Sequence, residues 1–270
     1  MATVLSFGVG KSRYVMMERA RVRSEIEVWG TVVFVDVASE KCDANSLNAG
    51  IEAVRHFVYH VDQDFSTYKP DSAVSRIRRG ELDIEQAPAD VKLVWDLCVD
   101  ALELTDGYFD PWCVEGGFDP SGYVKGWAAD KCIEILVRHG AENIQINAAG
   151  DLSLFGGFER EKPWSIGIRH PEDAEQIVKV YEIYSGAVAT SGTYERGAHI
   201  KDPHTGLIAI GARSATVSGP DGGLADALAT ALVVSGREGA YLFLKPELIE
   251  YSGWVIDRHS EMAWHTPVQQ

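Results

Sequence analysis

One stretch near the C-terminal end brings two oxygen-bearing side chains onto the same helix face. In residues 214–236 a β-branched run gives way to a glycine-rich loop and then to an Ala/Leu-rich helix. Asp226 and Thr230 are four residues apart, so they are neighbours on that helix. A carboxylate and a hydroxyl facing a glycine loop suit a hard cation such as Mg²⁺ that is shared with a phosphate. The alternative is a purely structural helix packed on a sheet, in which Asp226 complements the helix N-terminus and the Thr230 hydroxyl bonds to the helix backbone.

A second stretch, FDPSGYVKGWAAD, combines a carboxylate, a flexible backbone position and a cation. Asp119, Gly122 and Lys125 fall just before or within the first turn of an expected helix. The N-terminus of a helix is a suitable place to bind a phosphate or a metal. The alternative is a capped helix whose lysine faces solvent.

Several familiar motifs are absent or incomplete. Residues 7–12, FGVGKS, match only the end of a phosphate-binding loop, because Leu5 occupies the position of its leading glycine. No G-x-G-x-x-G follows a strand, and Ser191 lacks the glycines that flank the serine of a nucleophile elbow. His56 and His60 share a helix face but have no evident third ligand for zinc.

The composition limits the class of protein. The chain has 270 residues, 46% of them hydrophobic, and a formal net charge of −15, which argues against nucleic acid or an anionic membrane as a partner. No run of eighteen consecutive apolar residues is present, so we expect no stable membrane insertion. The start of the chain lacks the order of charges of a secretory signal, and the four cysteines show no C-x-x-C pairing. We therefore expect reduced thiols and a cytoplasmic location.

The elements that would position these residues alternate without a regular βαβ rhythm. Residues 25–38 predict a strand pair or one bent strand, and helices are expected over 51–65, from Pro88 to about Gly107, and from Tyr123 to Gly140. Strands are expected in 142–157 and 163–171, then a strand, loop and second strand in 187–206, and a short helix and a closing strand in 242–256. This order predicts an α+β fold of two interlocked lobes in a single domain, residues 1–270.

Eight ordered blocks give the chain a resemblance to a known family. They are WGTVVFV, DFSTYKPDSAVSRI, GYFDP, FDPSGYVKGWAADK, INAAGDL, AVATSGTYER, HIKDPHTG and SATVSGPDGGLADALATAL, and they span about residues 29–236. In this order they resemble the ApbE family of flavin transferases. The resemblance implies an ApbE-like, T-fold-related α+β domain with mixed or antiparallel sheets and flanking helices. It also implies Mg²⁺-dependent transfer of FMN from FAD to a threonine or serine hydroxyl of an acceptor protein, with release of AMP.

The resemblance also assigns roles to residues. It implies a metal site formed by Asp226, Thr230 and the Gly122 carbonyl, with Gly223 as a weaker backbone contact. The glycine loop at residues 219–223 is the expected wall of the cofactor cleft. The implied FAD contacts are Asp119, Lys125, the ring of Tyr68, the block Tyr108, Phe109 and Asp110, Trp29 in the position of a methionine, and Ser191 in a segment with Gly192 and Glu195.

His199 is the implied catalytic base. A histidine titrates near neutral pH, so one beside the pyrophosphate can take the proton of an attacking hydroxyl. Without the resemblance, His199 reads as a surface histidine at the end of a strand.

Besides Trp29, the chain departs from the family pattern at three places. Ala198 replaces a serine, the linker WCVEGG between the two F-D-P blocks is short, and so is the segment between Tyr194 and His199. Both shortened segments would remove material from the cleft wall, which would admit water to the site. Two alternatives to the transferase stay open. One is a FAD pyrophosphatase that uses water as the nucleophile, and the other is a non-catalytic FAD-binding protein.

Overall fold

The first described elements form a hairpin whose tip is set by two residues with positive φ. The computed structural model describes residues 19–173, 175–192, 200–258 and 262–267. β1 (Ala20–Val28) and β2 (Thr31–Ser39) pair antiparallel in one continuous register, with Val28 opposite Thr31. Trp29 and Gly30 between them have φ of 58° and 69°, as a two-residue turn that matches strand twist requires.

One antiparallel sheet organises the chain. Its strand order is β1-β2-β3-β4-β7-β8-β9-β10, and a separate hairpin is formed by β5 and β6. The remaining strands are β3 (Asn143–Ala148), β4 (Asp151–Phe155), β5 (Trp164–Arg169), β6 (Ile177–Ile183), β7 (Gly186–Gly192), β8 (Ala212–Gly219), β9 (Ser252–Asp257) and β10 (Ala263–Thr266).

The helices begin where the sequence supplies caps. The side chains of Asp43, Ser72 and Asp221 accept hydrogen bonds from backbone N–H groups in the first turns of α1, α2 and α5. The helices are α1 (Ala44–Phe65), α2 (Ala73–Arg78), α3 (Ala89–Leu104), α4 (Ser121–Arg138) and α5 (Gly222–Ser235), with 3₁₀ segments η1 (Ile84–Gln86), η2 (Gly236–Leu244) and η3 (Pro246–Leu248).

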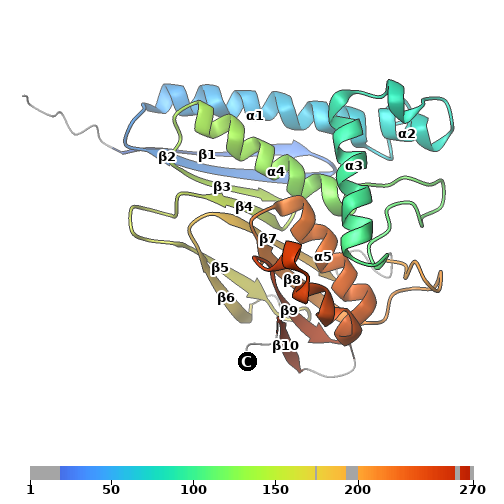
Figure 1. Ribbon diagram of the computed structural model, residues 1–270. Helices are drawn as coiled ribbons and strands as arrows, with labels where there is room; N and C mark the ends of the chain where they lie inside the picture. The colour runs from blue at the N-terminus through green and yellow to red at the C-terminus, as the bar shows by residue number, and fades with distance from the viewer. Residues whose placement is uncertain (1–18, 174, 193–199, 259–261, 268–270) are drawn as a thin grey trace, which may run out of the picture.

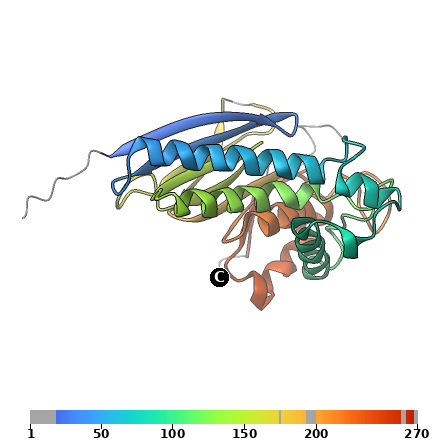
Figure 2. The same ribbon diagram turned by 90° about the horizontal axis from the view of Figure 1, so that it is seen from above.

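The molecule is layered, as Figure 1 shows. α1 and α4 pack over the β1–β3 end of the sheet, while α5 packs over β7 and β8. The β5–β6 hairpin covers part of the opposite face, where Trp164, Ile166 and Ile168 pack with Val188 and Trp254. In the view from above, α1 and α4 run side by side along the sheet (Figure 2).

Two glycines allow α4 and α5 to approach closely. A Cβ on Gly126 would lie 2.1 Å from the carbonyl oxygen of Gly222, and one on Gly223 would lie 2.4 Å from the ring of Tyr123. No side chain fits at either distance. The glycines at the start of α5 therefore serve helix packing, and this contact fixes α5 relative to α4.

The structure confirms the α+β class and most of the expected elements. The strand pair over 25–38 and the three long helices are present, although α4 begins at Ser121 and Pro88 lies at the cap position of α3 rather than inside it. The second strand expected within 187–206 is not found in its described part, where only a single bridge joins Lys201 and Ile208.

The longest apolar helical run is part of the core. Residues 222–244 are long and apolar enough to cross a membrane by composition alone, but 67% of the most apolar stretch is buried inside the fold. α5, at the start of this run, is enclosed by α4, β7 and β8. Its hydrophobicity is explained by packing.

Candidate functional site

A cleft of about 490 Å³ lies where α4, α5, β4 and β7 meet the loops around residues 67–68, 108–114 and 200–203. Its volume is in the range of small-molecule sites. The candidate residues Tyr68, Tyr108, Phe109, Asp110, Asp119, Gly122, Lys125, Ser191, Asp226 and Thr230 all line it.

A buried ion-pair cluster forms the floor. The Lys125 Nζ donates to Asp226 Oδ2 at 2.8 Å and to the Ser121 carbonyl at 2.9 Å, and lies 3.2 Å from Asp151 Oδ2. Both carboxylates are nearly inaccessible to solvent, with side chains 4% and 7% exposed. Although burial opposes its charge, these two carboxylates raise the pKa of Lys125. The ammonium therefore stays protonated and balances them.

Oxygen atoms gather beside this cluster. Thr230 Oγ1 lies 3.0 Å from Ser191 Oγ, which joins α5 to β7. Gly122 has non-helical backbone angles inside α4, and a Cβ there would lie 3.6 Å from Thr230 Oγ1 and 3.2 Å from the ring of Phe109. The missing side chain leaves the backbone of α4 open to the hydroxyl of α5.

Asp119 organises the start of α4. Its Oδ1 accepts hydrogen bonds from the Ser121 backbone N–H at 3.0 Å and from the Ser121 hydroxyl at 2.5 Å, and its Oδ2 lies 3.7 Å from Arg78. Asp119 thus orders the turn that leads into α4 at the cleft wall, while the cap position itself is Pro120 and has no side-chain cap hydrogen bond. The lysine of this block does not face solvent, because Lys125 turns inward to the two carboxylates.

Aromatic side chains form the opposite wall. Tyr108 packs edge-on against His204, with ring centroids 4.9 Å apart, and Phe109 is buried. Tyr68 is 96% exposed, so its ring has a free face for stacking. Asp110 accepts a hydrogen bond from the Trp112 backbone N–H at 2.8 Å and orders the loop that bears Tyr108 and Phe109.

A further carboxylate, that of Asp130, connects the elements that carry the site. Asp130 of α4 accepts hydrogen bonds from the Gly222 backbone N–H at 2.7 Å and from the Ser153 hydroxyl at 2.6 Å. Burial raises the pKa of Asp130 to about 6, although both hydrogen bonds oppose the shift. Through these bonds α4 is fixed to the first residue of α5 and to β4.

Two of the predicted positions, Trp29 and Gly223, do not line the cleft, and two others lie outside the described residues. Trp29 lies at the tip of the β1–β2 hairpin and is not among the residues that line the cleft. Gly222 and Gly223 belong to the first turn of α5, where Gly223 packs against the Tyr123 ring of α4, and neither glycine is among the residues that line the cleft. His199, like Glu195, lies outside the described residues. The roles of Trp29 and His199 stay predictions.

Asp151 is the site residue that the motifs left unnamed. It begins β4, directly after the positive-φ residues Ala149 and Gly150, and its Oδ1 accepts a hydrogen bond from the Thr190 backbone N–H at 3.2 Å. A carboxylate after an Ala-Gly turn in INAAGDL was the available signal. Its pairing with Lys125 arises only when β4 and α4 come together.

A second hollow, of about 620 Å³, lies on the outer face of β1, β2 and β3. Asp36 at its centre bonds both Arg21, at 2.8 and 2.6 Å, and Arg23, at 3.0 Å. Both arginines are thus held by this one carboxylate within the sheet face, whereas the cleft at Lys125 gathers hydroxyl, carboxylate and ammonium groups from several elements and is the better candidate for ligand chemistry.

Oxygen donors of the kind that Mg²⁺ prefers line the cleft. The Asp226 carboxylate and the Thr230 hydroxyl offer hard oxygen atoms beside the Lys125 ammonium, and Gly122 lines the same cleft. Within the described residues no group of three or more His, Cys, Asp or Glu side chains is arranged for a metal. A metal here would therefore take its further ligands from water and substrate phosphate, as Mg²⁺ commonly does.

Curated relatives share part of the sequence. A FAD:protein FMN transferase of Rhodobacter capsulatus is 34% identical over 128 residues, which cover 44% of this chain and 24% of that protein. One of Treponema pallidum is 31% identical over 145 residues, covering 47% and 40%. The matched regions thus span less than half the length of either relative.

Solved structures match nearly the whole fold. The flavin transferase ApbE from Vibrio cholerae aligns over 93% of this chain and 98% of its own, with a TM-score of 0.78 and 21% identity. The ApbE protein of Thermotoga maritima aligns over 92% and 97%, with a TM-score of 0.76 and 25% identity. The ApbE family model itself matches residues 114–251, just over half of the chain and most of the cleft. The chain belongs to the ApbE family.

Proposed function

We propose that this protein is a Mg²⁺-dependent FAD:protein FMN transferase. Its substrates would be FAD and a threonine or serine hydroxyl of an acceptor protein, and its second product would be AMP. The observation that carries the proposal is the Lys125 ammonium held by Asp226 and Asp151 on the floor of a cleft that also exposes Gly122 and Thr230. Curated relatives named FAD:protein FMN transferase support the same reaction.

The charges of the cleft explain why a metal would be needed. Its described lining includes four carboxylates, Asp110, Asp119, Asp151 and Asp226, but only two ammonium groups, those of Lys125 and Lys201. A pyrophosphate would be repelled by this excess of negative charge. When bound to Asp226, Thr230 and the Gly122 carbonyl, Mg²⁺ would neutralise phosphate charge and stabilise the AMP leaving group.

The chain's own residues would then bind and orient the substrate. Lys125 would contact a phosphate oxygen, Tyr68 would stack on a ring of FAD, and Phe109 beside Gly122 would exclude water. The acceptor oxygen would bond to the phosphorus on the FMN side of FAD, the bond from that phosphorus to the oxygen of AMP would break, and the hydroxyl proton would pass to His199. The product is FMN joined to the acceptor through a phosphoester.

The location proposed for this reaction is the cytoplasm. All four cysteines, Cys42, Cys98, Cys113 and Cys132, lie in described segments and none forms a disulfide. Burial raises the pKa of the Cys98 and Cys132 thiols, so these two are inert core groups. Reduced cysteines support a reducing compartment.

The reaction is tested by following the fate of FAD. We expect the protein, FAD and Mg²⁺ to release AMP only when an acceptor peptide with a threonine or serine is present, and the peptide to gain the mass of FMN. Asp226→Asn should lower the rate at least about 100-fold, because it removes the one metal carboxylate. Glu134→Gln, which changes an exposed carboxylate of α4, is the matched control.

The other outcomes separate the alternatives. Steady release of AMP and FMN without acceptor would identify a FAD pyrophosphatase, since water would then be the nucleophile. Bound FAD that stays intact with Mg²⁺ and every acceptor would identify a binding protein. Either result would overturn the transferase proposal.

A further inference from the structure

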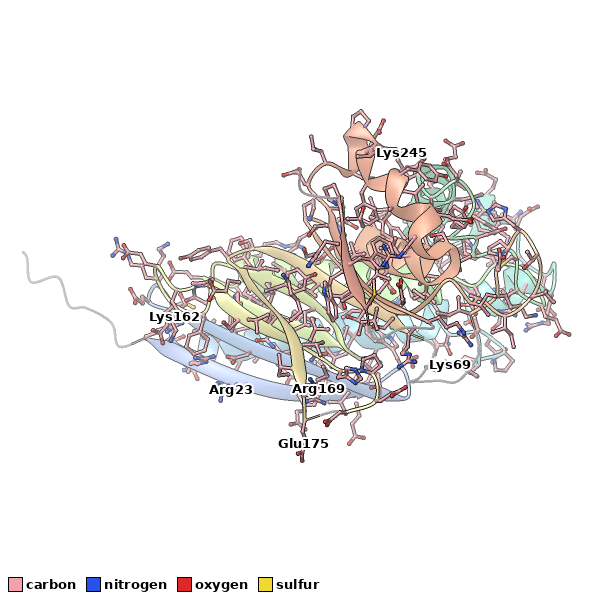
Figure 3. The ribbon with its side chains drawn as sticks, turned by 90° about the horizontal axis from the view of Figure 1, so that it is seen from below. Arg23, Lys69, Lys162, Arg169, Glu175 and Lys245 are labelled. Atoms are coloured by element: carbon pink, nitrogen blue, oxygen red, sulfur yellow. The ribbon has the colours of Figure 1, made fainter. Side chains whose placement is uncertain are left out.

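The outer strand of the sheet carries an ordered pattern of charges. β1 lies at one end of the strand order, and among the described residues no strand pairs with its outer edge. The β1 side chains on the exposed face of the sheet are, in order, those of Arg21, Arg23, Glu25 and Glu27. They are two cations followed by two anions. Arg23 lies on this strand in Figure 3, on the face away from the helices.

The two halves of this strand differ in how their charges are satisfied. Arg21 and Arg23 share one carboxylate, that of Asp36, so this half carries one excess positive charge. Glu25 and Glu27 form no side-chain ion pair or hydrogen bond within the part of the chain that the structure describes. A partner that presents the reverse order of charges would complement both halves.

The backbone of the same residues is available for pairing. Because Val28 and Thr31 flank a two-residue turn, they form a hydrogen-bonded pair, and the pattern alternates along the hairpin from there. The N–H and C=O groups of Arg21, Arg23, Glu25 and Glu27 therefore point away from β2, toward the open edge. An antiparallel strand laid against this edge can accept and return those hydrogen bonds.

We propose that two copies of this chain associate through β1, antiparallel, about a two-fold axis at Ser24. In that register Arg23 lies opposite the partner's Glu25 and Arg21 lies opposite the partner's Glu27, and each pair occurs twice by symmetry. The strand thus supplies its own complement.

No neighbouring register does the same. A shift of the axis to residue 23 places Arg23 opposite its own copy, and a shift to residue 25 places Glu25 opposite its own copy, and directly opposed like charges repel. If the axis lay midway between two residues, the outward N–H groups of one copy would lie opposite partner residues whose own N–H and C=O groups already bond to β2. Charge and backbone together select the axis at Ser24.

The inner face of the strand is compatible with this arrangement. Val22 would face the partner's Ile26 and Ala20 would face the partner's Val28, which extends the apolar layer under α1. Ser24 would meet its own copy at the axis, where a small side chain fits. The guanidinium group of Arg55, on α1, lies 3.4 Å from the Ser24 hydroxyl and 3.4 Å from the Glu52 carboxylate. Near the axis of the dimer, each of the two Arg55 guanidinium groups would therefore be paired with a carboxylate of its own chain.

Sedimentation velocity on the full chain tests the association. A strand-to-strand interface is small, so we expect a Kd on the order of 10 µM and a dimer of the 29.6 kDa chain at about 50 µM. Glu25→Arg turns both Arg23–Glu25 pairs into like-charge pairs and should raise the Kd about 30-fold. Arg23→Glu should do the same. Glu182→Arg, an exposed position on β6, makes the same change of charge and should leave the dimer intact.

Mixing the two reversed variants gives the sharper result. Glu25→Arg chains and Arg23→Glu chains should each be monomers alone but form a mixed dimer at a ratio of one to one, because every opposed pair is then complementary. Unfolding curves of each variant show that its fold is intact. A single 29.6 kDa species of the unaltered protein at about 200 µM, or a dimer that both reversals leave unchanged, overturns the proposal. The association concerns the strand edge alone, so its failure would leave the flavin transfer proposal untouched.

Discussion

At the scale of single residues, Lys125 is the group on which the cleft floor depends. Its ammonium lies between two carboxylates that are almost fully buried, 2.8 Å from Asp226 and 3.2 Å from Asp151. Bringing such carboxylates together without a cation is costly, because neither can be solvated by water. In the absence of a metal, Lys125 is therefore the counter-ion that allows the site to form.

Replacing this lysine should destabilise the protein in a way that a metal can relieve. We expect Lys125→Met to lower the free energy of unfolding by about 2 kcal/mol in EDTA, because two buried carboxylates lose their cation. Mg²⁺ should restore part of that loss by supplying positive charge at the same carboxylates. Urea unfolding with EDTA or Mg²⁺ measures both effects. Lys131→Met, which breaks a surface pair with Glu134, should change stability by less than about 0.5 kcal/mol, and equal losses for the two variants would contradict the assignment.

At the scale of elements, Asp130 connects α4 to α5 and β4. Since burial raises its pKa to about 6 in the folded protein, the folded state holds a proton here that the unfolded chain has lost at the same pH. The stabilisation that comes from this proton is complete below about pH 4 and is lost as the pH rises through 6.

Asp130→Asn should remove this part of the pH dependence. The unfolding free energy of the unaltered protein, relative to that of the variant, should fall by about 1 to 3 kcal/mol between pH 4 and pH 7. Urea unfolding of both proteins at a series of pH values measures the difference, and the other carboxylates cancel because the two chains share them. A difference that stays constant with pH would show that Asp130 titrates as it does in the unfolded chain.

The sequence predicted the elements better than it predicted their contacts. Apolar spacing and caps located α1, α3 and α4, because a helix face is written in local periodicity. β6 was not anticipated, since its exposed and half-buried residues lack clean alternation. Asp226 and Thr230 were found as neighbours on one helix, but Asp151 was missed and the glycine loop was assigned to the wrong surface. Both depend on how α4 meets β4 and α5, a contact between residues far apart in the chain.

At the scale of the whole molecule, the cleft joins segments that are distant in sequence. Its described wall is built from the loops before α2, after α3 and around residues 200–203, from α4 and α5, and from β4 and β7. The charge of the chain, −15, and the four carboxylates of the cleft oppose an anionic ligand, so binding should require added positive charge. The single-domain interpretation stays a prediction, and a ligand bound across these segments should stabilise them together.

FAD should therefore stabilise the whole protein only when Mg²⁺ is present. At a FAD concentration of about 100 times its Kd, the free energy of unfolding should rise by about 2.7 kcal/mol, because the ligand binds the folded state alone. In EDTA, or in Asp226→Asn, the gain should disappear, since the cleft then presents uncompensated carboxylates or lacks its metal carboxylate. Thermal unfolding followed by circular dichroism measures the shift, with Glu134→Gln as the variant that keeps it. An equal shift with FAD in EDTA would mean that the flavin binds without help from a metal, and the oxygen atoms of Asp226, Thr230 and Gly122 would need another role.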